Sequence, residues 1–246
     1  MTETTAVTDV RAEAERLQTL AGDNHYGSGL NASTIDYSFR VFSRHFVPGT
    51  CLELGPAEGL MTARLQAVFD DLTVVEASPQ FCASLQQRYP FITVVEALFE
   101  QYKPTRRFDN VVLGHVLEHV IDPVSILQSV RHWMTPHGHL LAAVPNAHSI
   151  HRQLAVVMGV LDAENTLNDT DARMGHRRVY TLTELRDDVR AAGFAVRVDG
   201  GYWLKPLSNA QIERDWTAEM IAAAMQVGER TPDIAGEIYI VAAPSE

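Results

Sequence analysis

Short apolar runs alternate with helix-like segments through the middle of the chain. Five runs have the composition of buried strands, and they lie at 50–54, 72–76, 92–96, 108–113 and 139–144. The segments between them with a helical pattern lie at about 59–69, 79–89 and 123–134. Apolar strands separated by helices are typical of a parallel sheet covered on both faces and joined by right-handed crossovers. The pattern predicts a doubly wound, Rossmann-like α/β domain.

The N-terminal part has a different pattern. Residues 8–21 and 32–46 predict helices, and the Gly-rich polar segment 22–30 between them predicts a loop. Helices placed before a sheet of this kind can cover its ligand site. We therefore expect residues 1–48 to form a helical lid and residues 49–246 to form the main domain.

Beyond the fifth strand the alternation loosens. The elements expected there are a helix at 149–161, a polar loop, a helix ending near 192, a strand at 195–199, a helix at 209–227 and a strand at 237–242. Thr181 or Thr183 can cap the second of these helices, and Gly193 can end it. We expect insertions at about 146–180 and 205–232 within one domain, before a final hairpin.

Composition and charge exclude several classes of partner. The net charge is −11, and no basic cluster exceeds the pairs Arg106-Arg107 and Arg177-Arg178, which argues against nucleic acid. No apolar run approaches the roughly 20 residues that span a bilayer, so we expect no membrane partner. The N-terminal segment lacks the apolar core of a signal peptide, and two cysteines do not make a disulfide framework. These features predict a cytoplasmic protein.

Two glycines and two acids carry the strongest chemical signal. Gly55 and Gly59 lie where the first strand must turn into a helix, and glycine there allows a ligand to approach the backbone. Glu76 ends the next strand, where an acid can accept hydrogen bonds from both hydroxyls of a ribose. The arrangement predicts a nucleotide-type ligand.

The spacing of the glycines distinguishes between two ligands of this type, NAD and S-adenosylmethionine (SAM). A dinucleotide site has the pattern G-x-G-x-x-G, whereas here Gly55 and Gly59 are separated by three residues. Glu53 would repel a pyrophosphate but would suit a cation. SAM has no phosphate and carries an ammonium and a sulfonium group, so the acidic variant favours SAM over an NAD-dependent oxidoreductase.

From about Cys51 to Phe194 the chain resembles the class I SAM-dependent methyltransferases, in particular the small-molecule branch that acts on natural products and sugars. Their motif E/D-x-G-x-G-x-G appears at 53–59, with Ala57 in place of the middle glycine. Three further segments match family patterns: 114–123 (GHVLEHVIDP), 136–139 (PHGH) and 175–181 (GHRRVYT). The resemblance implies a seven-stranded sheet whose last strand is antiparallel.

The resemblance also implies where SAM binds. Glu53 and the backbone of 55–59 would surround the methionine part, Glu76 would hold the ribose, and residues after the third strand would flank the adenine. The expected cofactor-binding residues are Glu53, Gly55, Pro56, Ala57, Gly59, Glu76, Ala77, Ala97, Leu98, Phe99, Gly114 and His115.

His115 and His119 are the candidate catalytic residues. Ligands of open α/β sheets bind beyond the carboxyl ends of the strands, where both histidines should lie. They are one turn apart if this segment is helical, and one of them could be a general base. The alternatives are that Glu118 and His119 fix the loop through hydrogen bonds and that His115 lines the SAM pocket. A base is optional, because positioning against a sulfonium can suffice.

A metal site is a further alternative. Two histidines and a carboxylate are typical ligands of a divalent transition metal. His115, Glu118 and His119, together with His176, are similar to the E-x-x-E-H…H metal site of small-RNA 3′-terminal 2′-O-methyltransferases. Here a histidine replaces the first glutamate, and the chain has no basic surface for RNA. We therefore expect no metal.

Several polar residues are candidates for binding the methyl acceptor. Three belong to the expected lid and the others to the expected insertions: His25, Tyr26, Tyr37, His148, Arg152, His176 and Lys205. A lid and late insertions suit an enclosed small molecule. We expect a methyltransferase acting on a small-molecule acceptor, with O-methylation as the leading hypothesis. The alternatives are N- or C-methylation and a SAM-binding protein without catalysis. A homodimer is the expected assembly if the chain has a protein partner.

Overall fold

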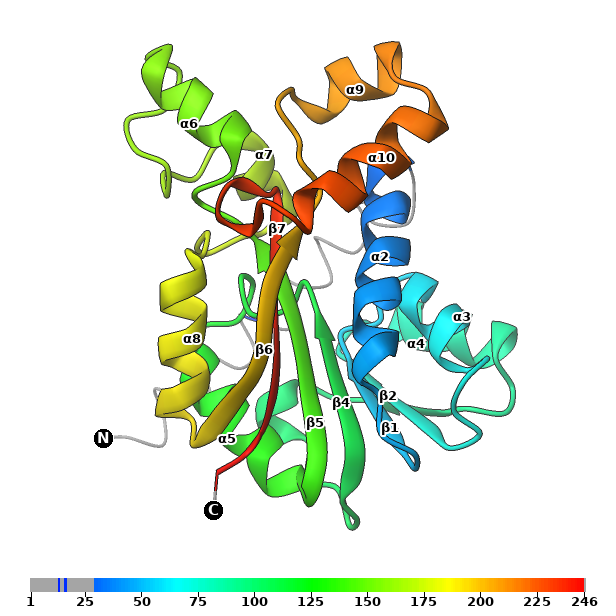
Figure 1. The fold of residues 1–246 in the computed structure, drawn as a ribbon. Helices are drawn as coiled ribbons and strands as arrows, with labels where there is room; N and C mark the ends of the chain where they lie inside the picture. Colours follow the sequence, from blue (N-terminus) through cyan, green and yellow to red (C-terminus); the bar gives the residue numbers. More distant parts are fainter. Residues whose placement is uncertain (1–12, 14–15, 17–28, 246) are drawn as a thin grey trace.

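The computed structural model describes Glu13, Arg16 and residues 29–245 (Figure 1). Its sheet has seven strands in the order β3-β2-β1-β4-β5-β7-β6. The strands are β1 (Cys51–Leu54), β2 (Leu72–Glu76), β3 (Thr93–Glu96), β4 (Phe108–Gly114), β5 (Met134–Pro145), β6 (Phe194–Tyr202) and β7 (Glu237–Pro244). Only β7 runs antiparallel to its neighbours, β5 and β6. The Rossmann-like fold and the antiparallel last strand are confirmed.

Helices cover both faces of the sheet. The α-helices are α2 (Gly29–Phe42), α3 (Leu60–Leu65), α4 (Pro79–Arg88), α5 (Pro123–Trp133), α6 (Ile150–Val157), α7 (Asp169–Met174), α8 (Leu182–Ala191), α9 (Asn209–Asp215) and α10 (Ala218–Gly228). Three short 3₁₀ turns are η1 (Ser43–His45), η2 (Phe99–Gln101) and η3 (Pro232–Ile234). Helices α6, α7, α9 and α10 lie beyond one end of the sheet, at the top of Figure 1. No helix in the described part is long and apolar enough to span a membrane.

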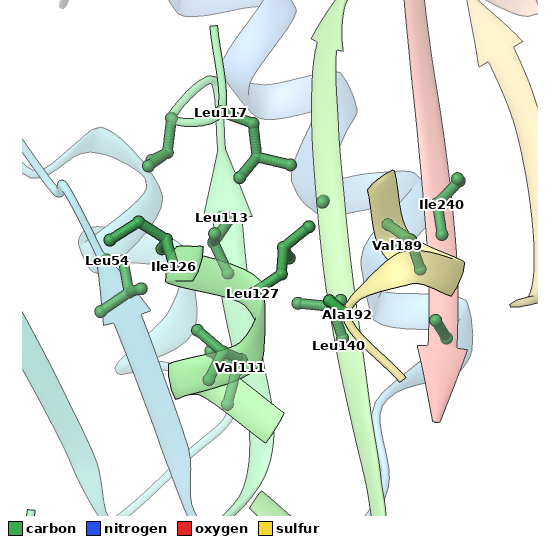
Figure 2. Packing of buried hydrophobic residues seen from close by; sticks show 14 of the residues in the cluster. Leu54, Val111, Leu113, Leu117, Ile126, Leu127, Leu140, Val189, Ala192 and Ile240 are labelled. Atoms are coloured by element: carbon green, nitrogen blue, oxygen red, sulfur yellow. The ribbon is translucent and has the colours of Figure 1, made fainter. Parts of the chain in front are cut away.

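Alternating side chains divide the core into two layers. Leu140 and Ala142 of β5 face the layer that α5 and α8 cover, while Leu141 and Ala143 face the layer that α2 and α3 cover. Successive side chains of a strand point to opposite faces, so an apolar run on a central strand supplies both layers. Figure 2 shows the first layer, with helix residues packed over β4, β5 and β7.

Local sequence signals set the helix starts around the site. Ser78 and Asp122 each accept a hydrogen bond from a backbone N–H of the first turn, and each is followed by proline at the first helical position. Thr181, not Thr183, caps α8, in a capping box with Glu184. These caps place the loops before α4, α5 and α8 at the carboxyl edge of the sheet.

The structure differs from expectation in the insertions. The single helix expected at 209–227 is two helices, because Trp216 is extended and Thr217 caps a new start by accepting from Met220 N. The polar loop expected after α6 contains α7, which Asn168 caps with the help of Asp171. Polar residues that resemble a loop in composition form helix termini here. The helix predicted at 8–21 lies outside the described residues except for Glu13 and Arg16.

Candidate active site

A cavity of about 670 Å³ lies at the carboxyl ends of the parallel strands. Its walls come from the turns after β1, β2 and β4, from α2, and from the segments 145–176 and 203–213. This volume is typical of small-molecule sites, and the position is the one at which open α/β sheets bind ligands. The predicted cofactor residues that line it are Glu53, Gly55, Pro56, Ala57, Glu76, Ala77, Leu98, Phe99, Gly114 and His115.

The turn after β1 is shaped by two residues in the left-handed region. Gly55 has φ +66°, and a Cβ there would lie 3.2 Å from Val116 Cγ2 and 3.5 Å from Phe99 Cζ. Ala57, which replaces the middle glycine of the family motif, has φ +47°. A side chain in that region costs roughly 1–2 kcal/mol. The turn therefore keeps its backbone open to the cavity at some cost in stability.

Glu76 is positioned to accept further hydrogen bonds from a ligand. Its Oε1 accepts from Ser78 N at 2.8 Å, and its Oε2 accepts from Ala57 N at 3.2 Å. Burial raises the pKa of the carboxyl, and these backbone N–H groups oppose that rise. Each carboxylate oxygen has a second acceptor site, so the side chain fits the predicted contact with ribose hydroxyls.

Glu53 carries a proton at neutral pH in the free protein. It is buried, and Thr62 Oγ1 donates to its Oε2 at 2.6 Å. Burial raises the pKa of Glu53 to about 8, the hydrogen bond from Thr62 opposes the rise, and the charge of Glu76 adds to it. A buried carboxyl at a cavity wall fits a cationic ligand group, which would favour its ionised form.

Two predicted cofactor residues lie outside the cavity wall. Gly59 begins α3 with φ +81°, and a Cβ there would meet Leu85 Cδ2 at 2.5 Å, so helix packing requires this glycine. Ala97 donates its N–H to Glu76 O at 3.0 Å and packs against the core. Both residues support the wall without lining the cavity, and their contact with the cofactor stays a prediction.

The segment from 115 to 122 is a series of turns and bends and not a helix, so His115 and His119 are not neighbours on a helix face. Both His115 and His119 still line the cavity, together with Glu118, whose side chain is 0% exposed. His115 has φ +60°, and its Nδ1 lies 3.5 Å from Glu118 Oε1 and 3.8 Å from Glu237 Oε2. Burial acts to lower the pKa of His115, but Glu118 and Glu237 together raise it.

His119 and His176 lie side by side at the cavity wall. Their ring centroids are 4.8 Å apart, and the ring planes are nearly perpendicular, at 84°. His119 Nδ1 lies 3.3 Å from the carbonyl oxygen of Gly175, and its Nε2 lies 4.0 Å from Glu118 Oε1. Burial lowers the pKa of His119 to about 4, although Glu118 acts in the opposite direction. His119 is therefore neutral at physiological pH.

Two predicted acceptor-binding residues lie outside the cavity. The Tyr37 hydroxyl donates to Glu229, and its ring packs 5.4 Å from that of Tyr202, so Tyr37 fixes α2 to the sheet. His148 is exposed and pairs with Glu164. Neither side chain lines the cavity, because Tyr37 points to Glu229 and His148 to Glu164, so their contact with the acceptor stays a prediction that this geometry does not favour. His25 and Tyr26 lie outside the described residues.

Arg152, Lys205 and His176 all line the cavity. Arg152 and Lys205 are held in place by hydrogen bonds to other residues of the protein. Arg152 is buried, and it donates to Asp171 Oδ2 at 3.0 Å and to backbone carbonyls of 164 and 166. Lys205 Nζ donates to Asn209 Oδ1 at 3.0 Å, and burial lowers its pKa. Arg152 thus braces the inserted segment around α7, and Lys205 keeps donors for a ligand.

Among the acids that line the cavity and were not predicted from sequence are Glu237 and Asp171. Glu237 lines the cavity as the first residue of β7, opposite Pro145 at the end of β5. The first residue of an antiparallel last strand lies at the carboxyl edge of its parallel neighbours, so the predicted topology could have identified it. Asp171 lines the cavity from α7, whose helical pattern was not recognised.

A family model and several solved structures are similar to this chain. A family model described as a methyltransferase domain matches residues 24–197. A SAM-dependent methyltransferase from Mesorhizobium loti is 16% identical, with a TM-score of 0.59 over 84% of this chain and 97% of that one. The N-methyltransferase NodS from Bradyrhizobium japonicum WM9, in complex with S-adenosylhomocysteine (SAH), is 13% identical, with a TM-score of 0.62 over 95% and 99%.

A third similar structure is the glycopeptide N-methyltransferase MtfA in complex with SAM. It is 14% identical, with a TM-score of 0.58 over 89% of this chain and 88% of that one. A comparison with curated proteins by sequence gave no match. The family match covers most of the chain, and the cavity has the predicted cofactor residues along one side. The chain therefore belongs to the methyltransferase-domain family and is a class I SAM-dependent methyltransferase.

Proposed function

We propose that the protein transfers the methyl group of SAM to an oxygen atom of a small-molecule acceptor. The observation that carries this proposal is one cavity with two unlike ends. One end has Glu53, Gly55 and Glu76 at its wall, and the other has half-buried histidines beside buried acids. Such a cavity suits a cofactor and an acceptor held side by side.

At the cofactor end, the residues would bind and orient. When bound, SAM supplies an activated methyl group on a sulfonium. Glu76 would accept hydrogen bonds from the ribose hydroxyls, and Glu53 would lie beside the cationic amino-acid part. The apolar side chains of Leu98 and Phe99 would flank the adenine and exclude water.

At the acceptor end, the imidazoles would handle a hydroxyl group. Neutral His119 can accept a hydrogen bond from an acceptor hydroxyl, and His115 lies between the two ends beside Glu118. A hydroxyl must lose a proton during methylation, whereas many other acceptors need only positioning. An imidazole next to buried carboxylates suits that need, so oxygen is the favoured acceptor atom. His115 and His119 remain our candidate catalytic residues.

The N-terminal segment would act as a lid over this end. Arg16 Nη2 donates to His119 O and to Gly175 O, both at 3.3 Å. Glu13 lines the cavity and accepts from Arg177 Nη2 at 2.5 Å. These contacts of Glu13 and Arg16 support the proposed lid, which would exclude water and polymers.

Binding of the cofactor product is the first test. Calorimetry should show that SAH binds and NAD does not. Glu76→Ala should weaken SAH binding by about 1–3 kcal/mol, the cost of losing hydrogen bonds to a charged acceptor. Glu219→Ala, which changes an exposed acid on α10 outside the cavity, is the matched control. An unchanged affinity for Glu76→Ala would contradict the ribose assignment.

A methyl-transfer screen would test the acceptor. Pairs of compounds that differ only in a hydroxyl or an amine group should be compared, because two similar structures are named as N-methyltransferases. The proposal predicts turnover of the hydroxyl compounds, and turnover of only the amines would establish the alternative.

The cellular setting is a further proposal. Both Cys51 and Cys82 are buried free thiols, which fits the reducing cytoplasm, and the proposed role there is small-molecule biosynthesis. A homodimer is the proposed assembly, and sedimentation analysis of the purified chain would measure it.

A further inference from the structure

Three of the side chains at the acceptor end together have the composition of a metal site. Glu118, His119 and His176 each offer one ligand atom, and the three atoms lie within 4.8 Å of one another. Glu118 and His119 come from the turn after β4, and His176 follows α7, so the group joins the sheet to the insertion. We propose that Glu118, His119 and His176 bind a divalent transition-metal ion that faces the acceptor. The proposal runs against the expectation of no metal from sequence.

The burial of Glu118 favours a bound cation. Its side chain is 0% exposed, and neither carboxylate oxygen has a partner with hydrogen-bond geometry among the described residues. A buried carboxylate without hydrogen bonds is costly, because it has lost its water and gained no donor. The Nδ1 of His115 lies 3.5 Å from Oε1, which gives a charge interaction only on that side. A cation between Glu118 and the other two imidazoles would satisfy the carboxylate.

The orientation of the two imidazoles is the second argument. His119 Nδ1 can donate to Gly175 O at 3.3 Å, and its Nε2 lies on the side of Glu118, 4.0 Å from Oε1. His176 Nδ1 lies 3.4 Å from Asp171 Oδ1, which leaves its Nε2 for a ligand. Metal-binding histidines usually have their other nitrogen next to a carbonyl or a carboxylate, and both arrangements occur here.

The backbone holds the two contributing segments together. Arg177 N donates to Glu118 O at 2.8 Å, and Arg177 Nε donates to His119 O at 2.9 Å. Ligand atoms about 2.0–2.2 Å from a metal lie roughly 3 Å apart, so modest side-chain rotations would complete the site. The preformed backbone would limit the entropy cost of binding the ion.

Two imidazoles and one carboxylate suit Mn²⁺, Fe²⁺, Co²⁺ or Zn²⁺, and they leave coordination positions open. All three residues line the cavity, so those positions face the acceptor. The ion would bind an acceptor oxygen, lower the pKa of its hydroxyl and fix its direction toward the cofactor end. This role rests on the proposed function, and in it His119 is a ligand and not a base.

Metal binding can be measured without turnover. The full-length chain, with any histidine tag removed and after EDTA treatment and dialysis, should be titrated with Co²⁺ and followed by calorimetry and visible absorption. We expect about one Co²⁺ per chain with a spectrum of protein ligation. His176→Gln and Glu118→Gln should each weaken binding by about tenfold or more, and His132→Gln, which changes an exposed histidine on α5, should not.

SAH binding in the same samples separates the outcomes. Variants that bind SAH as the original chain does are folded, so their loss of Co²⁺ would support the site. No uptake of Co²⁺ or Mn²⁺ by the original chain, or equal uptake by His176→Gln, would overturn the metal site. In that case intact SAH binding and EDTA-resistant methyl transfer would leave the proposed function standing. Uptake of Co²⁺ with no SAH binding would overturn the proposed function alone.

Discussion

The two ends of the cavity are built from different kinds of sequence. The cofactor end depends on residues 53–62 and 76–78, which are joined by hydrogen bonds across short stretches of chain. The acceptor end joins residues 115–119 to 171–176 and 237, which are far apart in the sequence. The first end is thus a local motif, and the second exists only once the whole domain is folded. This difference predicts that substitutions at the first end reduce cofactor binding, whereas substitutions at the second end reduce turnover without reducing cofactor binding.

The largest effect should come from closing the turn at the cofactor end. Gly55→Val places a branched side chain at φ +66°, against Val116 and Phe99. SAH affinity should fall by about 100-fold or more, equivalent to ~2.7 kcal/mol. Gly159→Val is the control, because Gly159 has φ +71° with nothing within 4 Å of its Cβ position. Calorimetry of both variants distinguishes a filled cavity from backbone strain, and equal losses would contradict the role of Gly55.

A comparable loss of turnover should come from the acceptor end with no loss of cofactor. Glu118→Gln keeps the shape of the side chain and removes its charge. We expect kcat/KM to fall by about 100-fold, the upper end of what a weakened metal site costs. SAH affinity should stay within about twofold. A parallel loss of SAH affinity would show that the two ends are one unit, which would break the comparison.

A smaller effect should appear in the pH dependence of cofactor binding. Glu53 is protonated in the free protein up to pH about 8, and a cationic ligand favours the carboxylate. Binding below pH 8 should therefore release a proton, and affinity should rise by at most about tenfold per pH unit up to that value. Calorimetry in two buffers of different ionisation enthalpy measures the release. Glu53→Gln should abolish it, and its absence from the original chain at pH 7 would contradict the assignment.

The smallest effect should come from residues that the sequence associated with the acceptor but the structure places elsewhere. Tyr37→Phe removes the hydrogen bond to Glu229 and should lower the free energy of unfolding by about 0.5–1.5 kcal/mol. Its kcat and KM should stay near those of the original chain. Thermal unfolding and turnover together check this, and a raised KM would return Tyr37 to the acceptor site.

The contrast also explains what could be predicted from sequence. Apolar runs predicted the strands and glycine spacing the turn after the first strand, because strands and tight turns depend on neighbouring residues. The antiparallel last strand and the residues expected around the adenine were implied by the family resemblance. Gly59 lies outside the cavity wall, at a position with φ +81° where a Cβ would meet Leu85, and no local pattern reveals this packing. His176 was expected to bind the acceptor, but its position beside His119 depends on α7 and on the contact of Gly175 with His119.

The position of β7 has a consequence for how the protein is made. Since β7 lies between β5 and β6, the sixth strand has no sheet neighbour until residues 237–244 have been synthesised. On the ribosome, β1 to β5 can pair as each is synthesised, whereas β6 and α8 keep apolar surface exposed until β7 has been synthesised. Glu237 then enters the cavity as the last strand inserts. The nascent chain could therefore bind its cofactor before its acceptor site exists, and completion of the sheet would be the step that makes it an enzyme.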